Sequence, residues 1–158
     1  MQIENDGRND WDFLIGTWKV HHRMLTQRLK GSADWVEFEG ETICKKIMNG
    51  LGNMDENIIH MKTGTVHAMS LRLFNPQSKE WSIHWSTDKM GALDTPMFGS
   101  FKDGIGEFYA QEINDGKQVY SRFIWSKIMA DSCQWEQALS DDGGKNWETN
   151  WVMEFERI

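Results

Sequence analysis

Strict alternation of apolar and polar side chains recurs along this chain and constrains its fold more than any other feature. Successive side chains of a β-strand point to opposite faces, so a period of two predicts strands with one buried and one wet face. Helical spacing is confined to the stretch 9–16, which suits one short turn. The alternating runs lie near 18–24, 36–42, 69–73, 81–85 and 147–155. The pattern predicts an all-β fold.

Short turn signals separate these runs. Glycine, asparagine and aspartate favour hairpin turns, and they gather at 62–65, 75–79, 102–104, 114–117 and 141–146. Longer connections lie at 29–34 and 87–96. Counting the runs gives about ten strands joined as a meander. Because closure removes exposed edge strands, we expect residues 1–158 to form one domain, a closed up-and-down antiparallel β-barrel.

Charge and composition narrow the function classes. Lys and Arg number 17 against 24 Asp and Glu, and the net charge of −7 disfavours nucleic acid as a partner. No apolar run approaches membrane-spanning length, and the first ten residues lack the order of a signal peptide. We therefore expect a cytoplasmic protein. Cys44 and Cys133 are too few for a disulfide framework or a zinc site, and we expect no cofactor.

The start of the first predicted strand resembles the calycin group, which includes lipocalins and fatty-acid-binding proteins. Gly16-Thr17-Trp18 matches the G-x-W signature of lipocalins. In that group the tryptophan plugs the closed end of the barrel, and a late basic side chain packs across it. The resemblance therefore implies that Arg157, at the end of the last strand, stacks on Trp18 as a cation–π contact.

A broader resemblance is to an uncharacterised bacterial family of lipocalin-like domains. It rests on FLIGTW (13–18), SLRLFNP (70–76), FKDGIGEFYA (101–110), SRFIW (121–125) and the segment 135–157. This resemblance implies the barrel fold and assigns no reaction.

One motif points to a different class of protein. Ser140, Asp142, Gly144 and Trp147 have the spacing of the Asp-box, a hairpin motif repeated in sialidase propellers. A sialidase needs several copies, and one copy in 158 residues is too few. We expect a turn in which Ser140 and Asp142 bond to the backbone and Trp147 packs beneath.

Three side chains are candidates for catalysis. A two-residue loop at Thr63-Gly64 would place His60 opposite His67, with Cβ atoms about 4.5–5.5 Å apart. Their phase is shared by Met69, Leu71 and Leu73, which we expect to face the interior, and Glu56 lies on the same strand face as His60. The alternative is that these are polar groups at a wet rim, because no third metal ligand is fixed by spacing.

A ligand pocket is predicted above an apolar floor that contains Trp18, Trp81, Trp125 and Trp135. Strict alternation places Arg72 and Arg122 outside, and a β-bulge would turn Arg122 inward to bind an anion. The candidate ligand-binding residues are His22, Glu56, Trp85, Tyr109, Gln111, Ser121, Arg122, Gln137 and Trp151.

Three functions compete at this point. The first is a non-enzymatic module that holds a small apolar or amphipathic molecule, with Met90 and Leu93 on a lid. The second is an acid–base enzyme of isomerase or hydrolase type that acts through His60, His67 and Glu56. The third is a homodimer that acts through an outward patch of Trp35, Phe74, Phe98 and Phe108.

Overall fold

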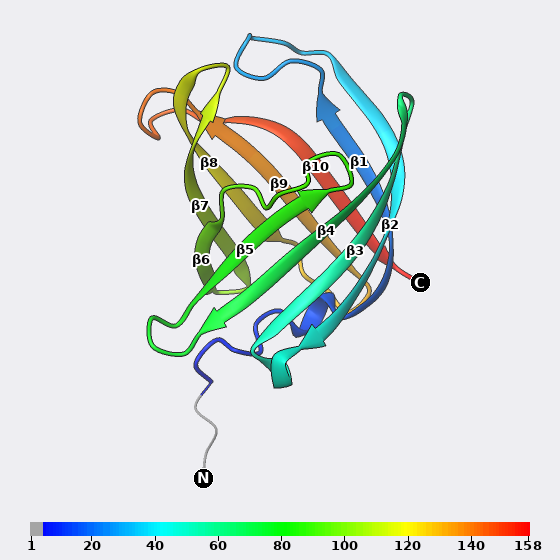
Figure 1. The fold of residues 1–158 in the computed structure, drawn as a ribbon, viewed down its shortest axis with the longest axis vertical. Helices are drawn as coiled ribbons and strands as arrows, with labels where there is room; N and C mark the ends of the chain where they lie inside the picture. Colours follow the sequence, from blue (N-terminus) through cyan, green and yellow to red (C-terminus); the bar gives the residue numbers. More distant parts are fainter. Residues whose placement is uncertain (1–4) are drawn as a thin grey trace.

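The computed structural model describes residues 5–158, which form a closed antiparallel β-barrel of ten strands (Figure 1). Each strand pairs with the next along the chain and β10 pairs with β1, which confirms the predicted up-and-down barrel. The strands are β1 (Gly16–Leu25), β2 (Trp35–Ile47), β3 (Gly52–Met61), β4 (Gly64–Asn75), β5 (Glu80–Thr87), β6 (Met97–Lys102), β7 (Ile105–Asn114), β8 (Lys117–Ser126), β9 (Ser132–Ser140) and β10 (Glu148–Arg157).

Two short 3₁₀ turns lie at the lower rim in Figure 1. The turn η1 (Asp12–Leu14) precedes β1, and η2 (Met48–Gly50) connects β2 to β3. The opposite rim carries the connection 26–34, the β3–β4 turn and the loop 141–147. In the described residues no helix is long and apolar enough to cross a membrane.

The lower end is sealed as the G-x-W resemblance implies. Trp18 is fully buried, and its indole Nε1 donates to the carbonyl of Leu14 at 2.8 Å. Arg157 is the registered partner of Trp18, and its Cζ lies 4.1 Å from the indole centroid. Its guanidinium also donates to the carbonyls of Ile15 (2.7 Å) and Phe13 (2.6 Å). The predicted cation–π contact is confirmed, and it ties the last strand to the segment before the first.

A second buried tryptophan closes this end of the barrel, and the sequence pattern does not predict it. Trp11, in the segment before β1, is 1 % exposed and sits inside the barrel end. Its ring centroid lies within 6.3 Å of those of five aromatic side chains, Phe13, Trp81, Phe101, Phe108 and Trp125. No alternating pattern surrounds Trp11, so its burial cannot be predicted from the spacing of apolar residues.

The β9–β10 loop confirms that the Asp-box spacing makes a turn. Ser140 Oγ accepts from the amide of Gly144 (2.9 Å), and Asp142 Oδ1 accepts from the amides of Lys145 (3.1 Å) and Asn146 (2.9 Å). These bonds hold the pKa of Asp142 down at about 2. Gly144 has φ +86°, and its carbonyl accepts from the Trp147 indole.

Strands β3 and β4 have the opposite inward phase from the one expected. The interior receives Asn53, Asp55 and Asn57 from β3, and Ser70 and Arg72 from β4, all of them buried. Met69, Leu71 and Leu73 lie outside and are half-buried. The predicted alternation along these strands is correct, and its assignment to the two faces of the sheet is wrong. On β4 the apolar side chains of Met69, Leu71 and Leu73 lie on the outer face, and Ser70 and Arg72 face the interior.

The predicted outward aromatic patch does not form. Phe74 is 5 % exposed and Phe108 is fully buried, so both belong to the core. Phe98 is 52 % exposed, and Trp35 lies under the guanidinium of Arg23. Without two of its four members, this patch no longer supports the dimer hypothesis.

Candidate ligand-binding cavity

The barrel encloses a cavity of about 180 Å³ above the aromatic lower end. Its lower walls are aromatic, formed by Trp125, Trp135 and Phe155, and charged side chains lie at two levels above them. The lining residues are Arg28, Asp55, Asn57, Ser70, Arg72, Ile83, Trp85, Asp94, Thr95, Met97, Glu112, Ser121, Phe123, Trp125, Trp135, Gln137, Trp151, Met153 and Phe155.

A buried ion pair forms the lower charged level. Arg72 Nη1 lies 2.7 Å from Asp55 Oδ2 and donates to Asn53 Oδ1 at 3.0 Å, and both charged side chains are 3 % exposed. The guanidinium also stacks against aromatic rings, 4.5 Å from the centroid of Trp11 and 5.6 Å from that of Trp125. Such a pair offsets the cost of burying charge only when further hydrogen bonds satisfy it.

Those further bonds come from β3, β4 and β2. Asp55 Oδ1 accepts from the side chain of Asn57 (2.5 Å) and from the backbone amide of Ser70 (3.0 Å). Asn57 in turn accepts from Thr42 Oγ1 at 2.6 Å. Arg72 Nε has no partner among the described residues. The network fixes one wall of the cavity.

The upper charged level lies where the barrel wall is incomplete. Strand β6 ends its pairing with β7 at Tyr109, so the upper half of β7 has no neighbour on that side. Asp94 and Thr95, from the connection between β5 and β6, line the cavity there, and the Asp94 amide donates to the carbonyl of Trp85 at 2.8 Å. Glu112 comes from β7 and Arg28 from the connection 26–34.

Burial governs the electrostatics of this level. Burial raises the pKa of the Glu112 carboxyl, and the nearby charge of Asp94 raises it further, while Arg28 and a hydrogen bond with Ser121 act in the opposite direction. Burial also lowers the pKa of Arg28, against the attraction of Glu112 and Asp94. Arg28 and Glu112 are therefore partly dehydrated, and the exposed Asp94 acts on both of them through its charge.

Two tryptophans from opposite walls divide the interior. Trp85 on β5 and Trp151 on β10 meet edge to face, with ring centroids 6.4 Å apart. Trp151 donates to His22 Nδ1 (3.2 Å), and His22 stacks on Phe38 with centroids 4.8 Å apart. Beyond this contact a second packed cluster of Phe38, Ile59 and Ala68 fills the space inside β2–β4. The two indoles line the cavity and separate it from this cluster.

The buried state of His22 predicts a pH dependence of stability. Burial, then the charge of His21, lowers the pKa of His22 from 6.5 to about 4. The unfolded chain takes up this proton below about pH 6.5 and the folded chain only below about pH 4. The free energy of unfolding is therefore highest above this window and falls by on the order of 3 kcal/mol as the pH drops through it.

Urea unfolding of the wild type and His22→Gln at about pH 7.5 and about pH 4.5 measures this effect. Glutamine keeps an acceptor for the Trp151 indole and does not titrate, so its pH dependence should be smaller by that amount. Equal pH dependence in the two proteins would contradict the assignment.

The predicted ligand-binding residues divide into two groups. Trp85, Ser121, Gln137 and Trp151 line the cavity, and His22 packs behind Trp151. The expectation that the others face the interior is wrong: Tyr109 is 43 % exposed, and Gln111 also lies outside. Arg122 stays on the outside as strict alternation requires, with its Cζ 4.4 Å from the centroid of Trp147.

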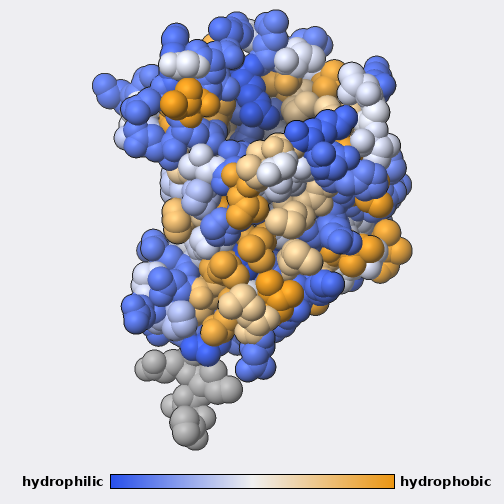
Figure 2. All heavy atoms as spheres, in the orientation of Figure 1, coloured by the Kyte–Doolittle hydropathy of each residue, from blue (hydrophilic) through white to orange (hydrophobic). Residues whose placement is uncertain are grey.

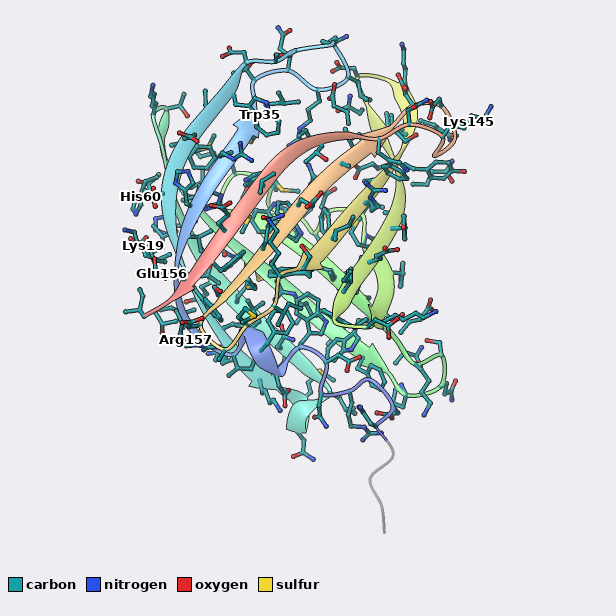
Figure 3. All side chains as sticks on the ribbon, turned by 180° about the vertical axis from the view of Figure 1, so that it is seen from behind. Lys19, Trp35, His60, Lys145, Glu156 and Arg157 are labelled. Atoms are coloured by element: carbon teal, nitrogen blue, oxygen red, sulfur yellow. The ribbon has the colours of Figure 1, made fainter. Side chains whose placement is uncertain are left out.

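The three catalytic candidates also lie outside. Met61 pairs with Gly64, so His60 faces Thr65 and His67 faces Ile58, and the expected pairing of the two histidines is wrong. His60 points away from the barrel (Figure 3) and bonds to Glu41 at 2.8 Å. Glu56 and His67 line a shallow outer groove with Ile58, Met69 and Leu93. Figure 2 shows apolar side chains gathered over β3, β4 and β5 on this face.

Sequence reasoning missed the charged half of the cavity. Asp55 and Arg72 were hidden by the inverted phase of β3 and β4. Arg28 and Asp94 lie in long connections, where no period places a side chain. Glu112 lies on the same face of β7 as Phe108, and the sequence pattern predicts that this face points outward. Among the described residues, no group of three or more His, Cys, Asp or Glu side chains is placed to hold a metal ion.

Comparisons with known proteins bear on the fold. No family model and no curated protein matches the chain, so membership of the bacterial lipocalin-like family stays a prediction. Among solved structures, Rv2717c from M. tuberculosis aligns with a TM-score of 0.60 at 8 % identity, over 94 % of this chain and 97 % of its own. The S-type phycobiliprotein lyase CPES from Guillardia theta aligns with a TM-score of 0.60 at 10 % identity, over 100 % and 98 %. This chain shares the calycin-like barrel fold of both structures.

Proposed function

We propose that this protein binds a compact, partly aromatic small molecule inside its barrel. The observation that carries the proposal is the interior cavity of about 180 Å³, lined by indole and phenyl side chains together with polar and charged groups. An apolar cavity of about 150 Å³ accepts benzene, so a ligand of one or two rings is the appropriate size. Aromatic walls with a few polar groups are the usual anatomy of a ligand site.

The catalytic alternative loses its support. All three residues lie outside the barrel: Glu56 and His67 line the outer groove, and His60 bonds to Glu41. The fold likeness to a phycobiliprotein lyase fits a barrel that accommodates a small molecule, but at 10 % identity it brings no reaction to this chain.

Intrinsic fluorescence tests the proposal because four tryptophans line the cavity. A panel of one- and two-ring aromatic compounds, together with linear aliphatic ones, is titrated against the wild type. We expect saturable quenching by members of the aromatic set. No saturable response to any compound would overturn the proposal.

A matched pair of variants locates the binding. Ser121→Leu adds bulk to the cavity, and Ser126→Leu makes the same change on β8 at the outward phase. We expect the first to weaken binding about tenfold or more and the second to leave it unchanged. Equal binding by both variants would place the ligand elsewhere.

A further inference from the structure

We propose that the ligand carries a positive charge, as an organic ammonium group held between Asp94, Glu112 and indole rings that line the cavity. This inference rests on the proposed function, and it names the chemical class of the ligand. It follows from the balance of charge inside the cavity and from the aromatic side chains there that have no cationic partner.

The charge balance leaves one carboxylate over. Five ionisable side chains line the cavity: Arg28, Arg72, Asp55, Asp94 and Glu112. Arg72 and Asp55 form a direct pair at 2.7 Å and neutralise each other. The upper level then contains two carboxylates and the single cation of Arg28. A neutral ligand leaves this excess in place, and an anionic ligand increases it.

The charged side chains of the upper level are not held to one another by direct ion pairs in the part of the chain that the structure describes. Within the described chain, Arg28 forms no direct ion pair with Asp94 or Glu112, although their charges act on it. Burial is the main cause of the raised pKa of Glu112, and the negative charge of Asp94 adds to it. A ligand cation placed among these groups would favour the ionised form of Glu112.

The aromatic walls favour the same class of ligand. Trp85, Trp135 and Trp151 line the cavity, and Trp151 meets Trp85 and Trp135 edge to face, with centroids 6.4 Å and 5.5 Å away. In the part of the chain that the structure describes, cations lie over Trp11, Trp18, Trp35, Trp125 and Trp147, and over none of these three. Indole faces attract organic cations, most strongly where water is excluded.

Three probes with one ring system and different charge test the proposal. Naphthylmethylamine is cationic at neutral pH, naphthylmethanol is neutral and naphthoate is anionic. Isothermal titration calorimetry on the whole chain should give the tightest binding for the amine, about tenfold weaker binding for the alcohol and weaker still for the acid. Equal affinities, or tighter binding of the acid, would overturn the cation proposal and leave the proposed function standing. If none of the three binds, both fail.

Charge-removing variants assign the effect to residues. Glu112→Gln should weaken the amine about tenfold and change the alcohol by less than about twofold. Asp94→Asn serves as a second, independent variant with the same expectation. Glu107→Gln is the matched control, because Glu107 is exposed on the outward phase of the same strand, β7. If the control weakens the amine as much as Glu112→Gln, the effect is general surface charge and the proposal is wrong.

Discussion

Asp55→Ala is expected to lower the free energy of unfolding by about 3–5 kcal/mol, the cost of leaving a buried charge without its partner. The substitution leaves the Arg72 guanidinium, which is 3 % exposed, without the one carboxylate that pairs with it among the described residues. It also removes the acceptor of the Asn57 side chain and of the Ser70 amide. Chemical denaturation at neutral pH measures the loss.

Two further variants separate charge from packing. The double variant Asp55→Leu, Arg72→Met removes both charges and should recover a large part of the loss, because a buried pair is often replaced by apolar groups at little cost. Asp141→Ala, at an exposed position of the β9–β10 loop, should change stability by less than about 0.5 kcal/mol. A double variant no more stable than Asp55→Ala would show that the pair is not the source of the loss.

Trp11→Ala is expected to cost a comparable amount, about 3–5 kcal/mol, through the cavity it leaves in the closed end. Trp11 contacts five other aromatic rings. The Cζ atom of Arg72 also lies 4.5 Å from the centroid of the Trp11 ring. Thermal or urea unfolding would measure the effect. Its removal should also expose the ion pair from below, so the two sites are coupled.

The conservative change at this position gives a sharp control. Among the described residues the indole nitrogen of Trp11 has no hydrogen-bond partner, so Trp11→Phe should lose packing only and cost less than half as much. Trp147→Ala, at a half-buried outer position, should also cost less. If Trp11→Ala proved no worse than Trp147→Ala, the closed end would not depend on this ring.

The sequence predicts the barrel because five runs alternate clearly and short turn signals separate many of the strands. The G-x-W resemblance also implied that Arg157 stacks on Trp18, and the two residues are partners in the pairing of β1 with β10. Alternation separates two faces of a strand and does not say which faces inward. In β4 the alternation predicts that Met69, Leu71 and Leu73 face the interior. In the structure Ser70 and Arg72 face the interior instead.

The candidate site was harder to predict for a related reason. Buried charges are stable only in pairs with satisfied hydrogen bonds, and the partners of Arg72 come from another strand. The register that joins them depends on one hairpin turn, where Gly64 begins β4 and does not occupy the turn. Moving that turn by one residue was enough to create the false pairing of His60 with His67.

The contact between Trp85 and Trp151 sets a limit on ligand length. A linear acyl chain that ran from the aromatic floor to the far rim would have to separate these rings and enter the packed cluster of Phe38, Ile59 and Ala68. Separating the rings alone costs about 0.5–1.5 kcal/mol, before any repacking. We therefore expect the two indoles to favour short, wide molecules over long, thin ones, independently of charge.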